Sequence, residues 1–255
     1  MISFLKRVRH AIRWRIHAYL GIGGEDNSQF DAVLSHFTKD LEPVIFDIGA
    51  HNGESIRRFK KIFPKSTIHA FEPDIGNFKI MDKGWGDKKG IILNNIGVSR
   101  KKGTLTFHRN LKTNTSSFHA VNTESEWAKM RSARQEVTPE EFTEKSYDVP
   151  IIDLDSYVDE HNISYIHVLK MDTQGHEDEV LAGAEKTLKS GIVDVIETEL
   201  IVGNAYTKSL QFYDLEKVLI PMGYRFYAID SAGDRLSTPS LSFNIIYVHE
   251  RLLNQ

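Results

Sequence analysis

The stretch Val44-Ile45-Phe46-Asp47-Ile48-Gly49-Ala50-His51-Asn52-Gly53 decides the fold. Its first residues are apolar without alternation, which is typical of a central strand buried on both faces. Gly49 and Gly53 frame the turn that follows, where glycine lets the backbone adopt positive φ and lets a ligand approach closely. The first amides of a helix after such a turn are unpaired and attract carboxylates or phosphates. The stretch therefore predicts a strand, a ligand-binding turn and a helix.

Strand-like runs and helical patterns alternate along the rest of the chain. This alternation predicts a Rossmann-like, doubly wound α/β fold with a mainly parallel sheet covered on both faces. We expect strands at 44–48, 67–71, 91–98, 104–109, 149–152, 166–171, 193–199, 225–229 and 243–249, with the strand at 104–109 paired to the preceding one in a hairpin. We expect helices at 30–37, 54–63, around Phe78, and at 156–161, 177–188 and 210–221.

The alternation suggests how the chain is divided. Residues 1–42 are expected to form an N-terminal helical extension, and residues 43–255 a single catalytic domain. Residues 110–148 have weak periodicity and high polarity. A segment this long inside a compact domain is usually a functional lid or a mobile insertion, so we expect it to contact the substrate.

Composition describes an ordinary water-soluble protein. Of the 255 residues 40% are hydrophobic and 26% charged, and the formal net charge is −3, which gives no general attraction to nucleic acid. No cysteine is present, so the chain has neither disulfides nor a Cys-ligated metal site, and a reducing cytoplasm fits. No apolar run approaches the roughly 18 residues that a transmembrane helix needs.

The first 20 residues form a basic amphipathic pattern. As a helix, their apolar positions 5, 8, 12, 16 and 19 share one face, which is typical of a helix lying in an anionic membrane surface. Packing of the same face on the domain, with a solvated basic side, is the alternative. We therefore expect a cytoplasmic protein with peripheral contact at the inner face of the membrane. The cations beside the apolar face are Lys6, Arg7, Arg9, Arg13 and Arg15.

Acidic residues end the first two predicted strands. Asp47 can accept hydrogen bonds from loop amides or from a cofactor ammonium group. Glu72, which Pro73 follows, can accept from both hydroxyls of a ribose. A dinucleotide would use the same geometry, but its fingerprint G-x-G-x-x-G is absent, because only Gly49 and Gly53 are present with three residues between them. The spacing favours S-adenosylmethionine, whose methionine part has a carboxylate and an ammonium group.

Asp172 and His176 are the candidate catalytic residues. Methyl transfer from a sulfonium to a hydroxyl is an in-line displacement, so positioning supplies most of the catalysis and a base takes the hydroxyl proton. Asp172 follows the strand at 166–171 at the carboxyl edge of the sheet, where open α/β folds bind ligands. The alternative is structural: Asp172 caps the next helix, and His176 packs or is solvated.

Further polar residues are expected around an acceptor. Glu197 and Glu199 share one strand face and could bind a cation with Asp172, but substrate hydroxyls or loop amides are commoner partners, so we predict no metal and assign Glu199 to the substrate. Asn114, Ser116 and Ser117 suit a polyhydroxylated acceptor, although the same composition also makes a plain turn.

The motifs together resemble the FkbM family of methyltransferases over roughly residues 43–200. The family's D-I-G-A-N-x-G reads D-I-G-A-H-N-G here, and Gly97 stands where alanine is commoner. The resemblance implies a class I methyltransferase fold, S-adenosylmethionine as donor, and O-methylation of a hydroxyl on a sugar, a glycan or a related metabolite. The other motifs are Phe71-Glu72-Pro73, Asn95-Ile96-Gly97-Val98-Ser99, Leu154-Asp155 and Lys170-Met171-Asp172-Thr173-Gln174-Gly175-His176-Glu177. The expected cofactor contacts are Asp47, Gly49, His51, Asn52, Gly53, Glu72, Pro73, Asn95 and Asp172.

A non-catalytic α/β binding or scaffold protein, held at a membrane by the basic helix, is the rival hypothesis. The intact run from Asp172 to Glu177 counts against it. Binding of S-adenosylmethionine, read as a thermal shift, separates the two.

Overall fold

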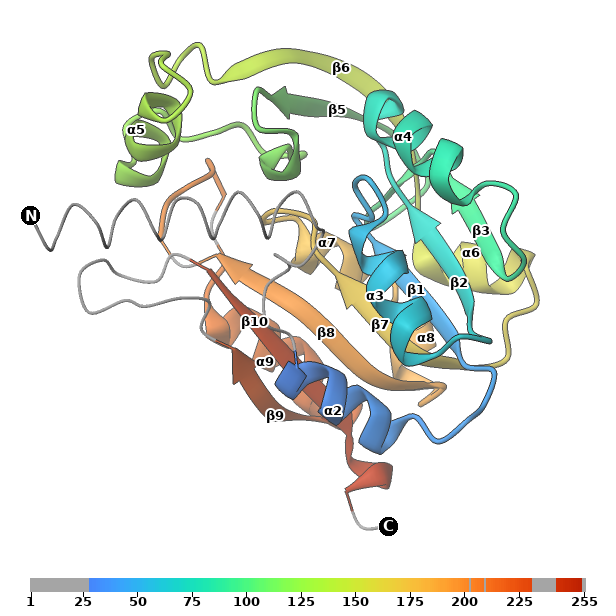
Figure 1. Cartoon of the computed structure of the whole chain (residues 1–255). Helices are drawn as coiled ribbons and strands as arrows, with labels where there is room; N and C mark the ends of the chain where they lie inside the picture. Colours follow the sequence, from blue (N-terminus) through green and yellow to red (C-terminus); the bar gives the residue numbers. More distant parts are fainter. Residues whose placement is uncertain (1–27, 202, 209, 231–241, 254–255) are drawn as a thin grey trace, which may run out of the picture.

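The computed structural model describes residues 28–201, 203–208, 210–230 and 242–253. The basic amphipathic pattern expected for residues 1–20 lies outside these residues. Figure 1 shows a central twisted sheet with helices on both faces and a smaller sheet above one end. No helix among the described residues is long and apolar enough to span a bilayer.

Seven strands form the central sheet, in the order β3-β2-β1-β7-β8-β10-β9. The five strands from β3 to β8 pair in parallel, and β10 lies antiparallel between β8 and β9. The order reverses between β1 and β7, where doubly wound folds bind ligands. The predicted mainly parallel sheet is confirmed. The strands are β1 (Val44–Ile48), β2 (Thr67–Phe71), β3 (Ile91–Asn94), β7 (Ile166–Met171), β8 (Val193–Ile201), β9 (Tyr224–Asp230) and β10 (Ser242–His249).

Two apolar cores lie on opposite faces of this sheet. The first packs under α2 (Ser28–Phe37), α3 (Glu54–Ile62) and α4 (Ile75–Trp85), which bury Leu34, Phe59 and Met81 against it. The second packs under four helices on the opposite face, which bury Tyr157 and Leu181 among others. These helices are α6 (Leu154–Glu160), α7 (Glu177–Ala182), α8 (Glu185–Lys189) and α9 (Phe212–Leu219).

The expected strand at 91–98 is two strands that belong to different sheets. β3 ends at Asn94, and β4 (Gly97–Val98) pairs with β6 (Thr143–Ile152) in a three-stranded sheet of order β4-β6-β5. The expected hairpin was therefore wrong, because β5 (Gly103–Asn110) pairs antiparallel with β6 and not with the strand before it. Between β5 and β6 lie the short helices η1 (Thr113–Thr115) and α5 (Glu126–Ala133).

The expected helix at 177–188 is broken at Gly183 into α7 and α8. A side chain at Gly183 would collide with the carbonyl oxygen of Ser99, and the carbonyl of Gly183 accepts from the amide of Asp155 at 2.9 Å. The break therefore brings the helical layer close to the chain after β4.

Candidate active site

Charged side chains follow one another along a single face of the central sheet. Asp47, Lys170 and Glu197 are register partners on β1, β7 and β8. Two residues further toward the carboxyl ends, on the same face, come Asp172 and Glu199. The parallel strands thus place a buried row of charged residue types, followed by a more open polar row, at the edge where the order of strands reverses.

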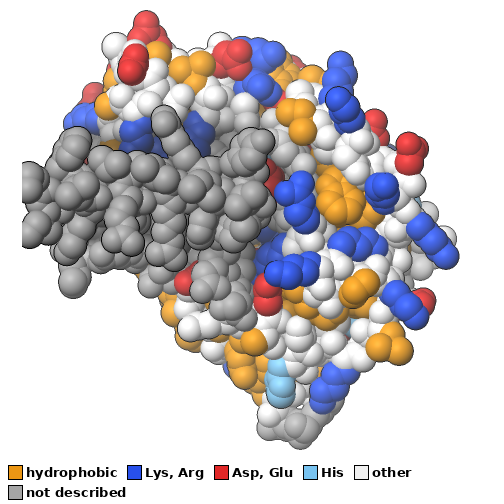
Figure 2. Space-filling model, viewed as in Figure 1, with side chains coloured by type: hydrophobic (Ala, Val, Ile, Leu, Met, Phe, Trp, Pro, Cys, Tyr) orange, Lys and Arg blue, Asp and Glu red, His pale blue; other side chains and the backbone are white. Residues whose placement is uncertain are grey.

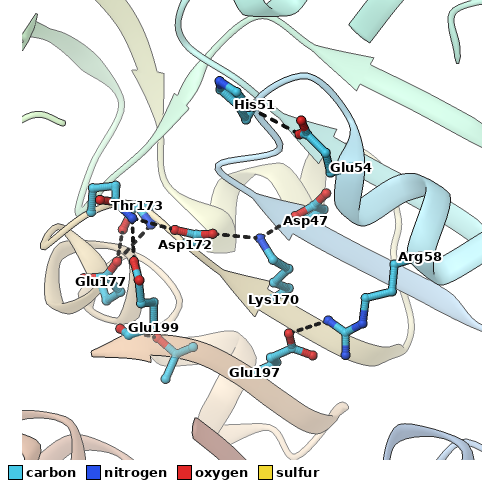
Figure 3. Close-up of polar contacts among 12 residues, drawn as sticks. Asp47, His51, Glu54, Arg58, Lys170, Asp172, Thr173, Glu177, Glu197 and Glu199 are labelled. Atoms are coloured by element: carbon cyan, nitrogen blue, oxygen red, sulfur yellow. Dashed lines mark hydrogen bonds and ion pairs between the residues drawn. The ribbon is translucent and has the colours of Figure 1, made fainter. Parts of the chain in front are cut away.

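Lys170 links the two rows. Its ammonium nitrogen lies 3.2 Å from Asp47 Oδ1 and 3.5 Å from Asp172 Oδ2. Figure 3 shows Lys170 between these two carboxylates. Burial by itself lowers the pKa of Lys170, but the carboxylates of Asp47, Asp172 and Glu197 outweigh it and raise that pKa. Burial raises the pKa of Asp47. The carboxylate of Asp47 contacts the ammonium group of Lys170. The sequence had suggested loop amides or a cofactor ammonium as its partners.

The glycine loop is shaped by contacts within the protein. Gly49 and Gly53 have φ of 82° and 83°, and a side chain at Gly49 would collide with the carbonyl oxygen of Asp172. The amides of Gly49 and Ala50 both donate to the carbonyl of Phe71, at 3.0 Å each. His51 adopts φ of 49°, and such a conformation in a non-glycine residue often accompanies function. Its Nε2 lies 2.8 Å from Thr113 Oγ1 and so connects the loop to η1.

Glu72 fixes the turn after β2. Its two carboxylate oxygens accept from the amides of His51 and Asp74, both at 2.8 Å, and burial raises its pKa to about 7. The side-chain amide of Asn95 donates to the carbonyl of Glu72 at 2.9 Å and to that of Pro73 at 3.3 Å. Asn95 thus supports the turn from behind. Each oxygen of Glu72 keeps a second acceptor position for a ligand.

A pocket that is partly open to solvent lies between these elements. Of the residues expected at the site, those that line it are Gly49, His51, Glu72, Pro73, Asn114, Ser116, Asp172 and Glu199. The expected residues outside its lining are Asp47, Asn52, Gly53, Asn95, Ser117 and His176.

The loop after β7 presents Asp172 to the pocket. The side chain of Asp172 is 40% exposed, and its Oδ1 accepts from the side-chain amide nitrogen Nε2 of Gln174 at 3.0 Å. Gln174, with φ of 57°, also donates to Glu199. The buried carboxylate of Glu177 accepts from the amides of Thr173 and Gly175, at 2.9 and 3.0 Å. These hydrogen bonds fix the conformation in which the loop places Asp172 at the pocket.

The insertion at residues 110–148 forms the opposite wall of the pocket. Asn114 and Ser116 line the pocket, and Ser117 Oγ donates to the carbonyl of Gln174 at 2.8 Å. The one hydroxyl proton of the buried Tyr206 is shared between the carbonyl of Thr115 at 2.8 Å and Gln174 Oε1 at 3.0 Å. Residues 110–148 therefore carry part of the pocket wall and are fastened to the Asp172 loop. The motifs include Lys170 and Gln174 but suggested no role for either, and no motif pointed to Tyr206.

His176 lies beneath the site rather than in its wall. It is 3% exposed and contacts Ser99 Oγ through Nε2 at 2.9 Å and His119 through Nδ1 at 3.3 Å. Burial, with the neighbouring His119, lowers its pKa to about 3. This placement favours the structural alternative for His176.

Two further residues lie apart from the pocket wall. Glu197 pairs with Arg58 at 2.6 Å and so turns away from Asp172 and Glu199. Asn52 has a buried Oδ1 without a hydrogen-bond partner among the described residues. Within those residues, no group of three or more histidine, aspartate or glutamate side chains is placed to hold a metal ion.

The doubly wound sheet, the glycine loop and the acid after β2 define a Rossmann-like α/β protein with a ligand pocket at the carboxyl edge of its sheet. The family model of the methyltransferase FkbM domain matches residues 47–226. The chain therefore belongs to the FkbM methyltransferase family.

One curated relative and two solved methyltransferase structures are similar to parts or all of this chain. The 2-O-methyltransferase NoeI of Sinorhizobium fredii is 30% identical over 152 residues, which are 58% of this chain and 59% of that protein. A TehB-like methyltransferase of Corynebacterium glutamicum is 10% identical at a TM-score of 0.43, covering 94% of this chain and 96% of its own. The magnesium protoporphyrin IX methyltransferase of Synechocystis, solved with the donor bound, is 9% identical at a TM-score of 0.46, over 88% and 79% of the two chains.

Proposed function

We propose that this protein transfers a methyl group from S-adenosylmethionine to a hydroxyl oxygen of a sugar, a glycan or a related metabolite. The observation that carries the proposal is the open carboxylate of Asp172, which shares one pocket with Glu72 and Glu199. The relative NoeI, a 2-O-methyltransferase by name, supports oxygen as the acceptor atom.

The pocket suits the donor in the chemistry of its wall. Glu72 would accept from the ribose hydroxyls, since each of its oxygens uses one backbone amide and can take a second donor. Ile96, Val98 and Phe107 give apolar wall for a flat base. When bound, the donor supplies an electrophilic methyl group. The side chain missing at Gly49 leaves the loop close to the Asp172 backbone.

We assign Asp172 as the general base. Lys170 and Gln174 hold its carboxylate, while the exposed part of the side chain faces the pocket. A carboxylate there can take the hydroxyl proton of the acceptor as its oxygen attacks. Because Glu199, Asn114 and Ser116 also line the pocket, an acceptor with several hydroxyls finds several polar partners. His176 acts in this account as a support beneath the loop.

Product analysis tests the proposal. Candidate glycans and small polyols are incubated with donor labelled on its methyl group, and the products are analysed by mass spectrometry. Labelled methyl ethers on carbon-bound oxygen support the proposal. Labelled methyl on nitrogen, carbon or carboxylate, with none on hydroxyls, contradicts it.

We also propose that residues 1–20 bring the enzyme to the cytoplasmic face of an anionic membrane. The support is the sequence pattern, in which five cations accompany an apolar helical face without an acid before Glu25. Co-sedimentation with anionic vesicles, compared between the full chain and one starting near Gly24, tests it. Equal binding of the two chains would refute a role for these residues.

A further inference from the structure

The outer surface of α3, α4 and the turns that follow them is strongly basic. Here we name this surface the α3–α4 face. Figure 2 shows Lys and Arg side chains gathered over this part of the molecule. Its exposed cations are Arg57, Lys61, Lys65, Lys79, Lys83, Lys88 and Lys89, and its exposed acids are Glu54, Asp82 and Asp87. The face is therefore positive in a chain whose formal net charge is −3.

These cations have no ionic partners within the described part of the chain. None of the seven takes part in a salt bridge there, whereas Lys186, Lys189, Lys208 and Lys217 on the opposite helical layer each pair with an acid. Glu54, one of the three acids, already contacts His51 at 3.3 Å. The positive charge of the α3–α4 face is thus left for an external anion.

The opposite layer has no such excess of unpaired cations among its described residues. Its helices α6 and α7 each contain three acidic residues and no basic one, and the four lysines named above are paired with acids. The charge of the two helical layers is therefore uneven. Such an asymmetry orients a protein with its basic side toward an extended negative surface.

Exposed apolar side chains on α4 favour a lipid bilayer over a nucleic acid as the negative surface. Ile75 and Ile80 are 45% and 57% exposed and lie among the lysines of that helix. Apolar side chains among cations suit the headgroup region of a bilayer, where they gain from burial as the cations meet lipid phosphates. A nucleic acid would favour exposed aromatic residues or arginine in that place.

We propose that the α3–α4 face docks on the surface of an anionic lipid bilayer. The face reaches the active site, because Pro73 precedes α4 and Asn77 lies in its first turn, and both line the pocket. Docking would therefore set the rim of the pocket beside the lipid headgroups. The proposal rests on residues other than 1–20 and on no assumption about the acceptor.

The test uses the full chain with vesicles of phosphatidylcholine, with and without phosphatidylglycerol. The variant Lys79→Gln, Lys83→Gln, Lys88→Gln removes three cations of the face. The matched control, Lys101→Gln, Lys102→Gln, Lys145→Gln, removes three exposed lysines elsewhere. Each cation near an anionic surface contributes roughly fivefold in affinity, so the first variant should bind anionic vesicles about 100-fold more weakly. The control should bind within a few-fold of the wild type.

Further measurements separate the possible failures. Far-ultraviolet circular dichroism and binding of the donor show whether each variant is folded and whether the proposed cofactor site persists. Equal binding of both variants and the wild type to anionic vesicles overturns the proposal. So does a loss of binding to single-stranded RNA without any loss on vesicles, since the face would then be a nucleic-acid surface. The separate variant Ile80→Ser should also weaken binding to anionic vesicles. The salt dependence of that binding should stay unchanged.

Discussion

Lys170 on β7 contacts Asp47 on the adjacent strand β1, with 3.2 Å between the ammonium nitrogen and Oδ1 and both side chains buried. A buried charge of this kind is tolerated only while its partner remains. The same ammonium reaches Asp172, so one residue joins the stability of the sheet to the position of the proposed base.

The variant Lys170→Met should lose about 3–5 kcal/mol of unfolding free energy, because it leaves Asp47 buried without a counter-charge. Urea unfolding of the full chain measures the loss. In the double variant with Asp47→Asn, much of that stability should return, since the uncompensated charge is gone. A loss below about 1 kcal/mol in the single variant would show that the pair contributes little.

Glu72 should make donor binding depend on pH. Burial raises the pKa of its carboxyl to about 7 in the free protein. Protonation removes an acceptor that the ribose hydroxyls need, so the affinity for S-adenosylhomocysteine should fall as the pH drops below about 7. Calorimetric titration over pH measures it. With Glu72→Gln this pH dependence should disappear, and with Glu72→Ala binding should weaken by roughly 1.5–3 kcal/mol. Unchanged affinity in both variants would place the ribose elsewhere.

His176 should make the protein less stable toward unfolding as the pH falls. Burial lowers the pKa of His176 in the folded state to about 3, from an ordinary value of 6.5, so the unfolded chain binds the proton better between these values. The free energy of unfolding should therefore decrease as the pH falls below about 6.5, by up to about 1.4 kcal/mol per unit from this group. His176→Asn should lack this component, which the difference between the two unfolding curves reveals. Parallel curves from about pH 7 to pH 5 would contradict the burial of a neutral imidazole.

Tyr206 should influence the acceptor more than the donor. Its hydroxyl ties Thr115 in the insertion to Gln174 in the Asp172 loop. Tyr206→Phe removes both hydrogen bonds, and we expect a loss of about 1 kcal/mol in stability together with a several-fold rise in the KM for the acceptor. Steady-state kinetics with each substrate varied in turn measures the effect. An increase confined to the donor's KM would place Tyr206 on the cofactor side.

Much of the fold follows from local sequence patterns. The apolar run of β1, the glycines after it and the acid after β2 predict the half of the sheet that carries the pocket, and their positions agree with the structure. The split between β3 and β4 could not be predicted in this way. Both segments are strand-like, and only their pairing with β2 and with β6 assigns them to different sheets.

The contacts among the buried charged residues also could not be predicted from the sequence. Sequence places Asp47 and Lys170 in separate motifs 123 residues apart, and strand register alone makes them partners. Gln174 and Tyr206 are likewise brought together by the folding of the insertion over the loop. For His176, its place in a motif suggested chemistry, whereas packing against Ser99 and His119 gives it a buried position outside the pocket wall.

Comparison of Asp172→Asn with His176→Asn decides whether Asp172 is the base of a methyl transfer to a hydroxyl. Single-turnover transfer of labelled methyl and calorimetric binding of the donor are measured for both. We expect Asp172→Asn to lower the transfer rate by about 10²–10⁴-fold while donor affinity changes little, and folded His176→Asn to stay within about tenfold of the wild type. Transfer at the wild-type rate by Asp172→Asn would contradict this role of Asp172.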